Sequence, residues 1–226
     1  MVKVALISVA LAAAGVFGGA ATSTSCEIII LSQLRKVETH DVTCDEQLNC
    51  SPHGEQSAAA PDSSGWSASV SSGRAHADQV SSALTSLMQY AHGRCSSSGG
   101  FDIFWPPTQT FGVAQSTFSM RFSVRSRCIA ELRGNISVDV RDGAGAADFQ
   151  LIDGSTGIYS IRVDSCSDCS TIATIDRHFD FKPDFVYELV VGVSSRGDAS
   201  TSFDLYLDVS TPVTALVWGD VKQLYR

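Results

Sequence analysis

The chain has 226 residues, which is room for one domain of ordinary size or two small ones. Hydrophobic residues make up 44% and charged residues only 18%, so the chain has enough apolar material for a core and is not disordered throughout. The net charge of −8, with no cluster of basic residues, argues against nucleic acid and anionic membrane surfaces as partners.

Residues 1–21 have the order of regions that is typical of a secretory signal peptide. Lys3 gives a short positive start, an uncharged apolar run follows, and Gly19 and Ala21 occupy the −3 and −1 positions of a cleavage site. The run is shorter than the ~20 apolar residues of a membrane-spanning helix, so we expect no transmembrane span after cleavage. A lipoprotein anchored at Cys26 would need an aliphatic residue before it, where the chain has Ser and Thr. We expect a secreted, periplasmic or cell-surface protein.

The segment after the signal predicts a small cysteine-containing N-terminal extension and linker, residues 22–64. It holds three of the seven cysteines and the pair Arg35-Lys36. Residues 51–64 contain two prolines, a glycine and three alanines, a composition typical of a linker or long loop.

All seven cysteines lie beyond the signal segment, where an oxidising compartment makes disulfides the default state. Their odd number leaves at least one free or paired with another chain. We expect local disulfides between Cys44 and Cys50 and between Cys166 and Cys169. The second spacing also suits a redox dithiol or half of a zinc site, but it follows a strand-like run and has no convincing second ligand pair. The cysteines are at positions 26, 44, 50, 95, 128, 166 and 169.

The strongest structural signal is a repeated period-2 alternation of apolar and polar residues within residues 65–211. Short turn signals separate the alternating runs, and no clear helical pattern lies between them. This arrangement predicts an all-β fold, an antiparallel two-sheet β-sandwich of jelly-roll type with about eight strands. The runs lie at residues 118–124, 136–140, 159–163, 187–193 and 203–209.

Two segments are harder to interpret. Residues 76–92 fit both a helical and a strand period, and their Ser content and the neighbouring strands favour strands. Residues 212–226 form a C-terminal tail richer in aromatic and basic residues than the domain before it. We expect this tail to be a final strand or an amphipathic end docked on the sandwich, with a short export or docking signal as the alternative.

Several of these runs together resemble the uncharacterised exported β-sandwich proteins of bacteria, many of which carry a C-terminal sorting tail. In that group an aromatic strand leads into leucine-x-proline-glycine-x-tyrosine. Here Phe181-Lys-Pro-Asp-Phe-Val-Tyr187 has Asp184 in place of the glycine and one residue more before the tyrosine. The resemblance covers residues 65–211 and implies export and a β-sandwich, but no catalytic residues. The matching runs are residues 66–70, 75–79, 118–124, 179–189 and 202–209.

The motifs of common catalytic sites are missing from the sequence. It has no Gly-x-Ser-x-Gly nucleophile elbow, no His-Glu-x-x-His and no phosphate-binding glycine loop. Glu131 and Glu188 are the only glutamates of the sandwich region and form no acidic motif of the kind a glycosidase needs, although a pair of aspartates could serve. We predict no cofactor; calcium is the ion that the acidic turns would suit. Those turns carry Asp139, Asp142, Asp148, Asp164 and Asp168.

The sequence therefore favours a non-catalytic module of the cell envelope or extracellular space that binds a ligand or glycan. Trp66 and Trp105 are the candidate binding residues, because exposed aromatic faces stack on sugar rings. The alternative is a structural or adhesive surface protein without a small-molecule site, whose partner is another surface protein. A secreted glycan-active enzyme is the third hypothesis.

Overall fold

The computed structural model describes residues 26–82, 88–102, 108–154, 156–165 and 169–210. The signal segment, the C-terminal tail, Trp105 and Cys166 therefore lie outside the described residues. The described part of the chain contains strands and no helix, as expected for an all-β protein. The strands are β1 (Ile28–Cys44), β2 (Cys50–Ala59), β3 (Trp66–Ser71), β4 (Ala75–Ser82), β5 (Met88–Ser97), β6 (Gly99–Asp102), β7 (Thr108–Val124), β8 (Cys128–Asp153), β9 (Thr156–Asp164), β10 (Cys169–Phe181) and β11 (Val186–Ser210).

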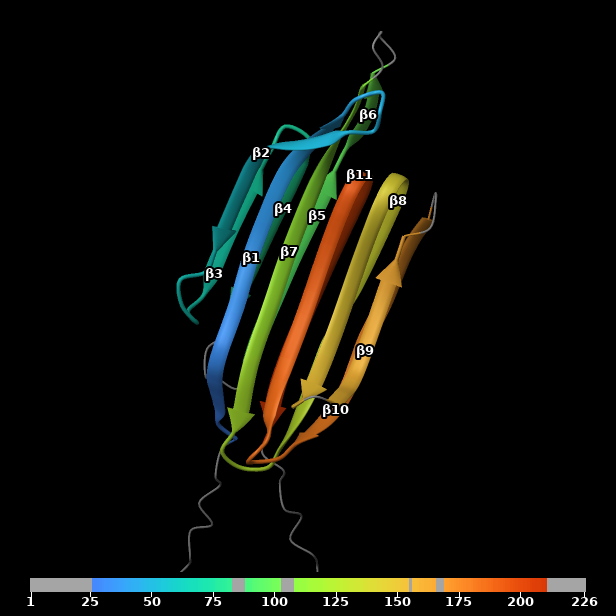
Figure 1. The fold of residues 1–226 in the computed structure, drawn as a ribbon. Coiled ribbons are helices and arrows are strands. Elements are labelled where there is room, and N and C mark those ends of the chain that lie inside the picture. The colour runs from blue at the N-terminus through green and yellow to red at the C-terminus, as the bar shows by residue number, and fades with distance from the viewer. Residues whose placement is uncertain (1–25, 83–87, 103–107, 155, 166–168, 211–226) are drawn as a thin grey trace, which may run out of the picture.

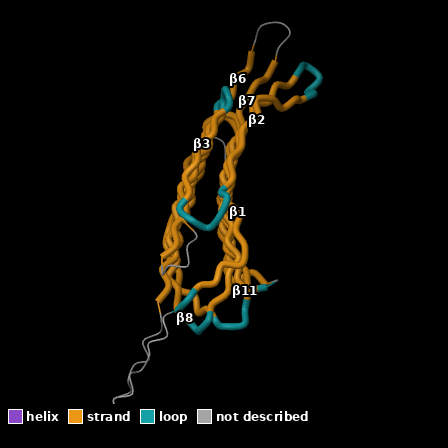
Figure 2. Tube along the Cα trace, turned by 90° about the vertical axis from the view of Figure 1, so that its left-hand side faces the viewer, coloured by secondary structure: helices purple, strands orange, loops and turns teal. Residues whose placement is uncertain are grey.

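The strands form one antiparallel sheet that folds over into two layers (Figures 1 and 2). The fold-over occurs in β8 and β11, which are paired along almost their whole length. Residues 186–196 of β11 also pair with β7, whereas residues 199–208 pair with β5. Layer 1 therefore contains β2, β1, β7, the first half of β11, the second half of β8, and β9. Layer 2 contains β3, β4, β5, the second half of β11, the first half of β8, and β10.

The expected two-layer sandwich is present, but residues 28–59 belong to it and do not form a separate extension. β1 pairs with β7 from Ile28 to Cys44 and with β2 on its other side. Residues 51–59, where the composition indicates a linker, form most of β2. β2 is an exposed edge strand, held by main-chain bonds to β1, so its side chains show no alternation of apolar and polar residues. With β1, β2 and the short β6 included, the described strands number eleven where the sequence predicts about eight.

The core lies between the two layers and is made by the alternating residues that the sequence pattern identifies. In β11, for example, Phe203, Leu205 and Leu207 are buried, whereas Tyr206 and Asp208 between and after them are exposed. Residues 76–92, which fit both a helical and a strand period, are strands wherever the structure describes them. They belong to β4 and to the first residues of β5.

Disulfides join the layers and close one hairpin. The expected Cys44–Cys50 bond links the end of β1 to the start of β2. A second bond, which local spacing did not predict, joins Cys26 to Cys128 and so connects the start of β1 in layer 1 to the start of β8 in layer 2. Cys169 is also disulfide-bonded, and its expected partner lies outside the described residues.

The odd cysteine is Cys95, which is free and fully buried between the layers. Its Sγ lies 3.6 Å from the carbonyl oxygen of Val193. Burial raises the pKa of this thiol far above its ordinary value, so it stays protonated and is not available to another chain.

An aromatic cluster fills the end of the sandwich opposite the fold-over. The ring of Tyr187 lies 4.5 Å from that of Phe181 and 5.6 Å from that of Phe122, measured between centroids. The Lys182 N–H donates to Tyr187 Oη at 2.8 Å, which ties the turn before β11 to the cluster. Burial raises the pKa of the Tyr187 phenol. In the segment Lys182 to Tyr187, the final tyrosine therefore stabilises the turn that precedes it.

Asp184 in that turn has a φ of 70°, a conformation that glycine adopts without steric cost. We expect Asp184→Gly to raise the free energy of unfolding by about 0.5–1 kcal/mol, because it relieves the clash that a Cβ makes in this region. Urea denaturation of the variant and of Asp184→Ala, which keeps the Cβ, measures the effect. A glycine variant no more stable than the alanine variant contradicts this explanation.

Candidate functional site

Of the two tryptophans proposed from the sequence, the structure describes only Trp66. Trp66 begins the edge strand β3, is half-buried and packs against the core. Its ring lies 5.8 Å from the guanidinium carbon of Arg35, so its face is partly engaged within the protein. Trp105 lies outside the described residues.

Exposed aromatic rings lie instead on the outer face of layer 2. Tyr90 on β5 and Tyr206 on β11 are direct cross-strand partners, with exposed fractions of 37% and 44%. Arg133 on β8 is the next residue across from Tyr206, and Asp176 on β10 is the next across from Arg133. We call Tyr90, Tyr206, Arg133 and Asp176 the tyrosine row. It crosses four adjacent strands and so extends about 14 Å.

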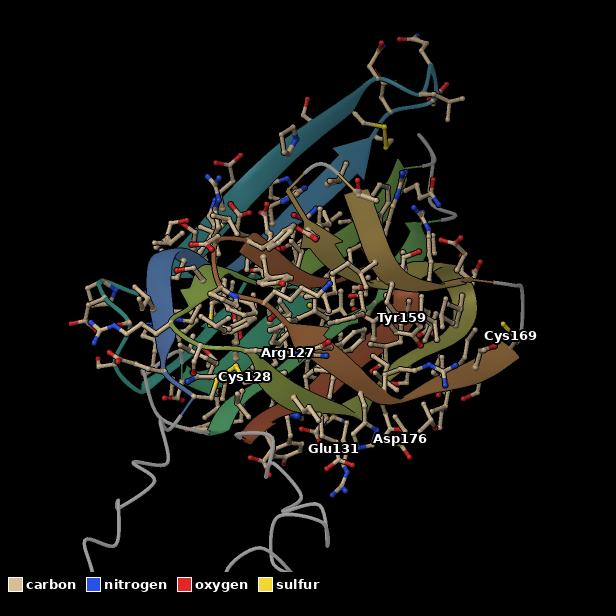
Figure 3. All side chains as sticks on the ribbon, turned by 90° about the horizontal axis from the view of Figure 1, so that it is seen from below. Arg127, Cys128, Glu131, Tyr159, Cys169 and Asp176 are labelled. Atoms are coloured by element: carbon tan, nitrogen blue, oxygen red, sulfur yellow. A yellow bond between two sulfur atoms is a disulfide. The ribbon has the colours of Figure 1, made fainter. Side chains whose placement is uncertain are left out.

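Charged pairs border the tyrosine row. His92 and Asp204 occupy the neighbouring cross-strand positions, with Nδ1 and Oδ1 4.0 Å apart. On the other side, Arg133 Nη2 lies 2.5 Å from Glu131 Oε1, and the same carboxylate lies 3.5 Å from His178 Nε2. Figure 3 shows Glu131 and Asp176 projecting from the same face. The row thus combines two aromatic rings with hydrogen-bonding groups of both charges at fixed positions.

The alternation in β11 already indicated that Tyr206 points outward, but the sequence could not show its neighbour. Tyr90 lies more than a hundred residues earlier, and the two meet only because β5 and β11 pair in the sheet. Residue type alone favours tryptophans as candidates, whereas strand pairing brings Tyr90 and Tyr206 together.

The outer face of layer 1 is also hollowed. One hollow of about 420 Å³ over β1, β2 and β7 is lined by Glu38, His40, Glu55 and Gln115, among others. Glu38 forms an ion pair with Lys36, so one of the two glutamates is already engaged. Glu38 and Glu55 are the two carboxylates that line this hollow.

The acidic residues considered for calcium are spread over the sandwich. Because β8 passes from one layer to the other, Asp139 pairs with β10 in layer 2, whereas Asp148 pairs with β9 in layer 1. In the part of the chain that the structure describes, no three His, Cys, Asp or Glu side chains gather in a group that could hold a metal ion.

The compartment is indicated by the cysteines. Disulfides of this kind form and persist in oxidising environments, such as the extracellular space or the periplasm. Within the described ranges there is no helix of the length and hydrophobicity that crossing a bilayer requires.

No family model and no curated protein matches the chain. Among solved structures it is similar to the enzymatically active domain of tailspike protein 4 from bacteriophage CBA120, at 9% identity and a TM-score of 0.27, over 61% of this chain and 19% of that one. It is also similar to a chain in the structure of infectious bursal disease virus Gx strain, at 9% identity and a TM-score of 0.22, over 85% of this chain and 63% of that one.

A further similar structure is the VP2 subviral particle of infectious bursal disease virus, at 10% identity and a TM-score of 0.24, over 84% of this chain and 63% of that one. The chain therefore spans about a fifth of the tailspike chain and less than two thirds of the viral chains. At these TM-scores the similarities carry no argument about function.

Proposed function

We propose that this protein is an exported, non-catalytic β-sandwich that binds glycans, and that sugar rings stack on Tyr90 and Tyr206. The proposal rests on one observation, the side-by-side placement of two exposed tyrosines in the middle of a sheet face. Aromatic rings supply a large apolar contact at small cost in conformational entropy, and the polar tip of tyrosine also bonds to hydroxyl groups.

The neighbouring polar groups support this proposal because sugar recognition requires hydrogen bonds that fix orientation. Arg133 and His92 provide donors, and Asp204 and Asp176 provide acceptors, within one or two residue spacings of the rings. The row spans about 14 Å, so we expect an extended oligosaccharide to lie across the strands.

Export also belongs to the proposal. The signal-like segment 1–21 and the resemblance to exported bacterial β-sandwich proteins support secretion, and the disulfides fit the oxidising compartment that secretion implies. We propose that the protein acts at the cell surface or outside the cell.

We expect Tyr90→Ala combined with Tyr206→Ala to weaken glycan binding at least tenfold, because each ring contributes about 1 kcal/mol or more. A glycan array screened with the secreted chain identifies the sugar, and titration calorimetry measures the loss. Phe185→Ala is the matched control, since Phe185 is 43% exposed in the turn before β11, away from the row.

Binding that survives in the double tyrosine variant overturns the assignment of the site. Absence of binding to every glycan on the array overturns the function itself and favours the structural or adhesive alternative.

A further inference from the structure

A hollow of about 360 Å³ lies at the fold-over end of the sandwich, far from the tyrosine row. One wall is the bend of the sheet, Asp142 to Ala144 of β8 and Arg196 and Gly197 of β11. The other wall is Gly99 of β6 with Gln109 and Phe111 of β7. The volume lies within the range of small-molecule sites, which begins at about 300 Å³.

The hollow exists because the bend requires glycine. Gly197 has a φ of 72°, and a Cβ at this position would approach the Asp142 carbonyl oxygen to 2.8 Å. A Cβ at Gly143 would come within 2.2 Å of the Arg196 carbonyl oxygen. The two strands therefore turn the corner in close backbone contact, and no side chain from these two positions fills the space beside them.

Arg196 supplies the chemistry of this hollow. Its guanidinium carbon lies 4.2 Å from the centroid of the Phe111 ring, a cation–π contact that supports one face of the planar group. Phe111 is itself only 4% exposed and packs with Val42 and Cys44, so the support is rigid. Arg196 forms no ion pair with any described residue, in contrast to Arg127 and Arg162.

A guanidinium held by its face keeps its N–H edges for a ligand, and their fork geometry matches a carboxylate. The same hollow contains the acceptor Asp142 and the amide of Gln109. Asp142 repels a doubly charged phosphate more strongly than a singly charged carboxylate, and it accepts hydrogen bonds from hydroxyl groups. A ligand with one carboxylate and several hydroxyls therefore satisfies all three side chains.

We propose that this hollow is a second binding site and that it takes a uronic acid, either free or as a residue of an acidic saccharide. The overall charge of −8 repels anions in general, so binding of such a ligand requires a local site of this kind. The site shares no residue with the tyrosine row, and the two sites can therefore be tested separately.

The experiment titrates the full chain with glucuronate and galacturonate, and with glucose, galactose and inorganic phosphate as matched probes. We expect the uronates to bind at least tenfold more tightly than the neutral sugars and phosphate, and Arg196→Gln to abolish that preference. Arg162→Gln is the control, because Arg162 is an exposed arginine already paired with Asp164. Tyr90→Ala with Tyr206→Ala should leave uronate binding unchanged.

Equal binding of uronates and neutral sugars overturns the proposal, as does uronate binding that persists in Arg196→Gln. Equal binding of phosphate overturns the choice of a carboxylate. Loss of uronate binding in the double tyrosine variant alone places the ligand on the tyrosine row and also overturns it. Arg196→Gln also loses the cation–π contact with Phe111, which is worth about 0.5–1 kcal/mol at an exposed site, so its melting temperature should lie only a few degrees below that of the parent chain.

Discussion

Replacing Cys26 and Cys128 together by alanine should lower the free energy of unfolding by about 4–5 kcal/mol, because their disulfide closes a loop of about a hundred residues in the unfolded chain. The two positions are separated by 102 residues in the sequence. Both cysteines are buried at the end of the sandwich opposite the fold-over, so the bond holds the two layers together where no continuous strand does. We expect this crosslink to be a major source of stability.

The Cys44–Cys50 disulfide provides a matched control in the same chain. Its sequence separation is only 6, for which the same chain-entropy relation gives about 2 kcal/mol. Urea denaturation of both double alanine variants under non-reducing conditions measures the two losses. Equal losses, or a larger loss from the short loop, would contradict the argument from loop length.

The strands could be predicted from the sequence because their side chains face two different environments. Phe118, Met120 and Phe122 alternate with polar residues, and β7 is a strand with these residues in the core. β2 shows the limit of this signal. It is an exposed edge strand stabilised by main-chain bonds, which leave no mark on side-chain polarity.

The fold-over could not be predicted for a related reason. Period-2 alternation is present before and after Gly143 in β8 and before and after Gly197 in β11. From the sequence, each strand therefore looks like two separate runs, although each is one strand that crosses from one layer to the other. The bend is visible only when the two glycines are placed opposite each other in the register. The tyrosine row and the Cys26–Cys128 bond likewise form because strands far apart in the sequence pair with each other. No local sequence pattern predicts either feature.

The second large effect concerns Arg35, a fully buried arginine on β1. Its Nη1 donates to the carbonyl oxygens of Ser64 at 2.8 Å and Ser81 at 3.1 Å, and its Nη2 donates to that of Asp62. Burial lowers the pKa of the guanidinium, which nevertheless stays charged at neutral pH. The side chain thus connects β1 in layer 1 to β4 and to the segment that leads from β2 to β3.

We expect Arg35→Ala to lower the free energy of unfolding by about 3–5 kcal/mol, since it leaves three carbonyl groups without their charged donor and opens a cavity. Arg35→Met tests the cause, because it keeps most of the aliphatic stem and removes only the donors. If the hydrogen bonds dominate, the methionine variant loses at least half of the stability that the alanine variant loses.

Lys36→Ala is the matched control, because Lys36 is the next residue on β1, is partly exposed and makes a surface ion pair with Glu38. Lys36→Ala should lower the free energy of unfolding by less than about 1 kcal/mol.

Hydrogen exchange supplies an independent measurement. Relative to the parent chain, Arg35→Ala should increase the exchange rate of the β3 amides more than that of the β9 amides. β3 lies next to the contacts of Arg35, whereas β9 lies at the opposite edge of the sandwich. Uniformly faster exchange across all strands would show that Arg35 acts only on global stability and not as a clamp on this edge.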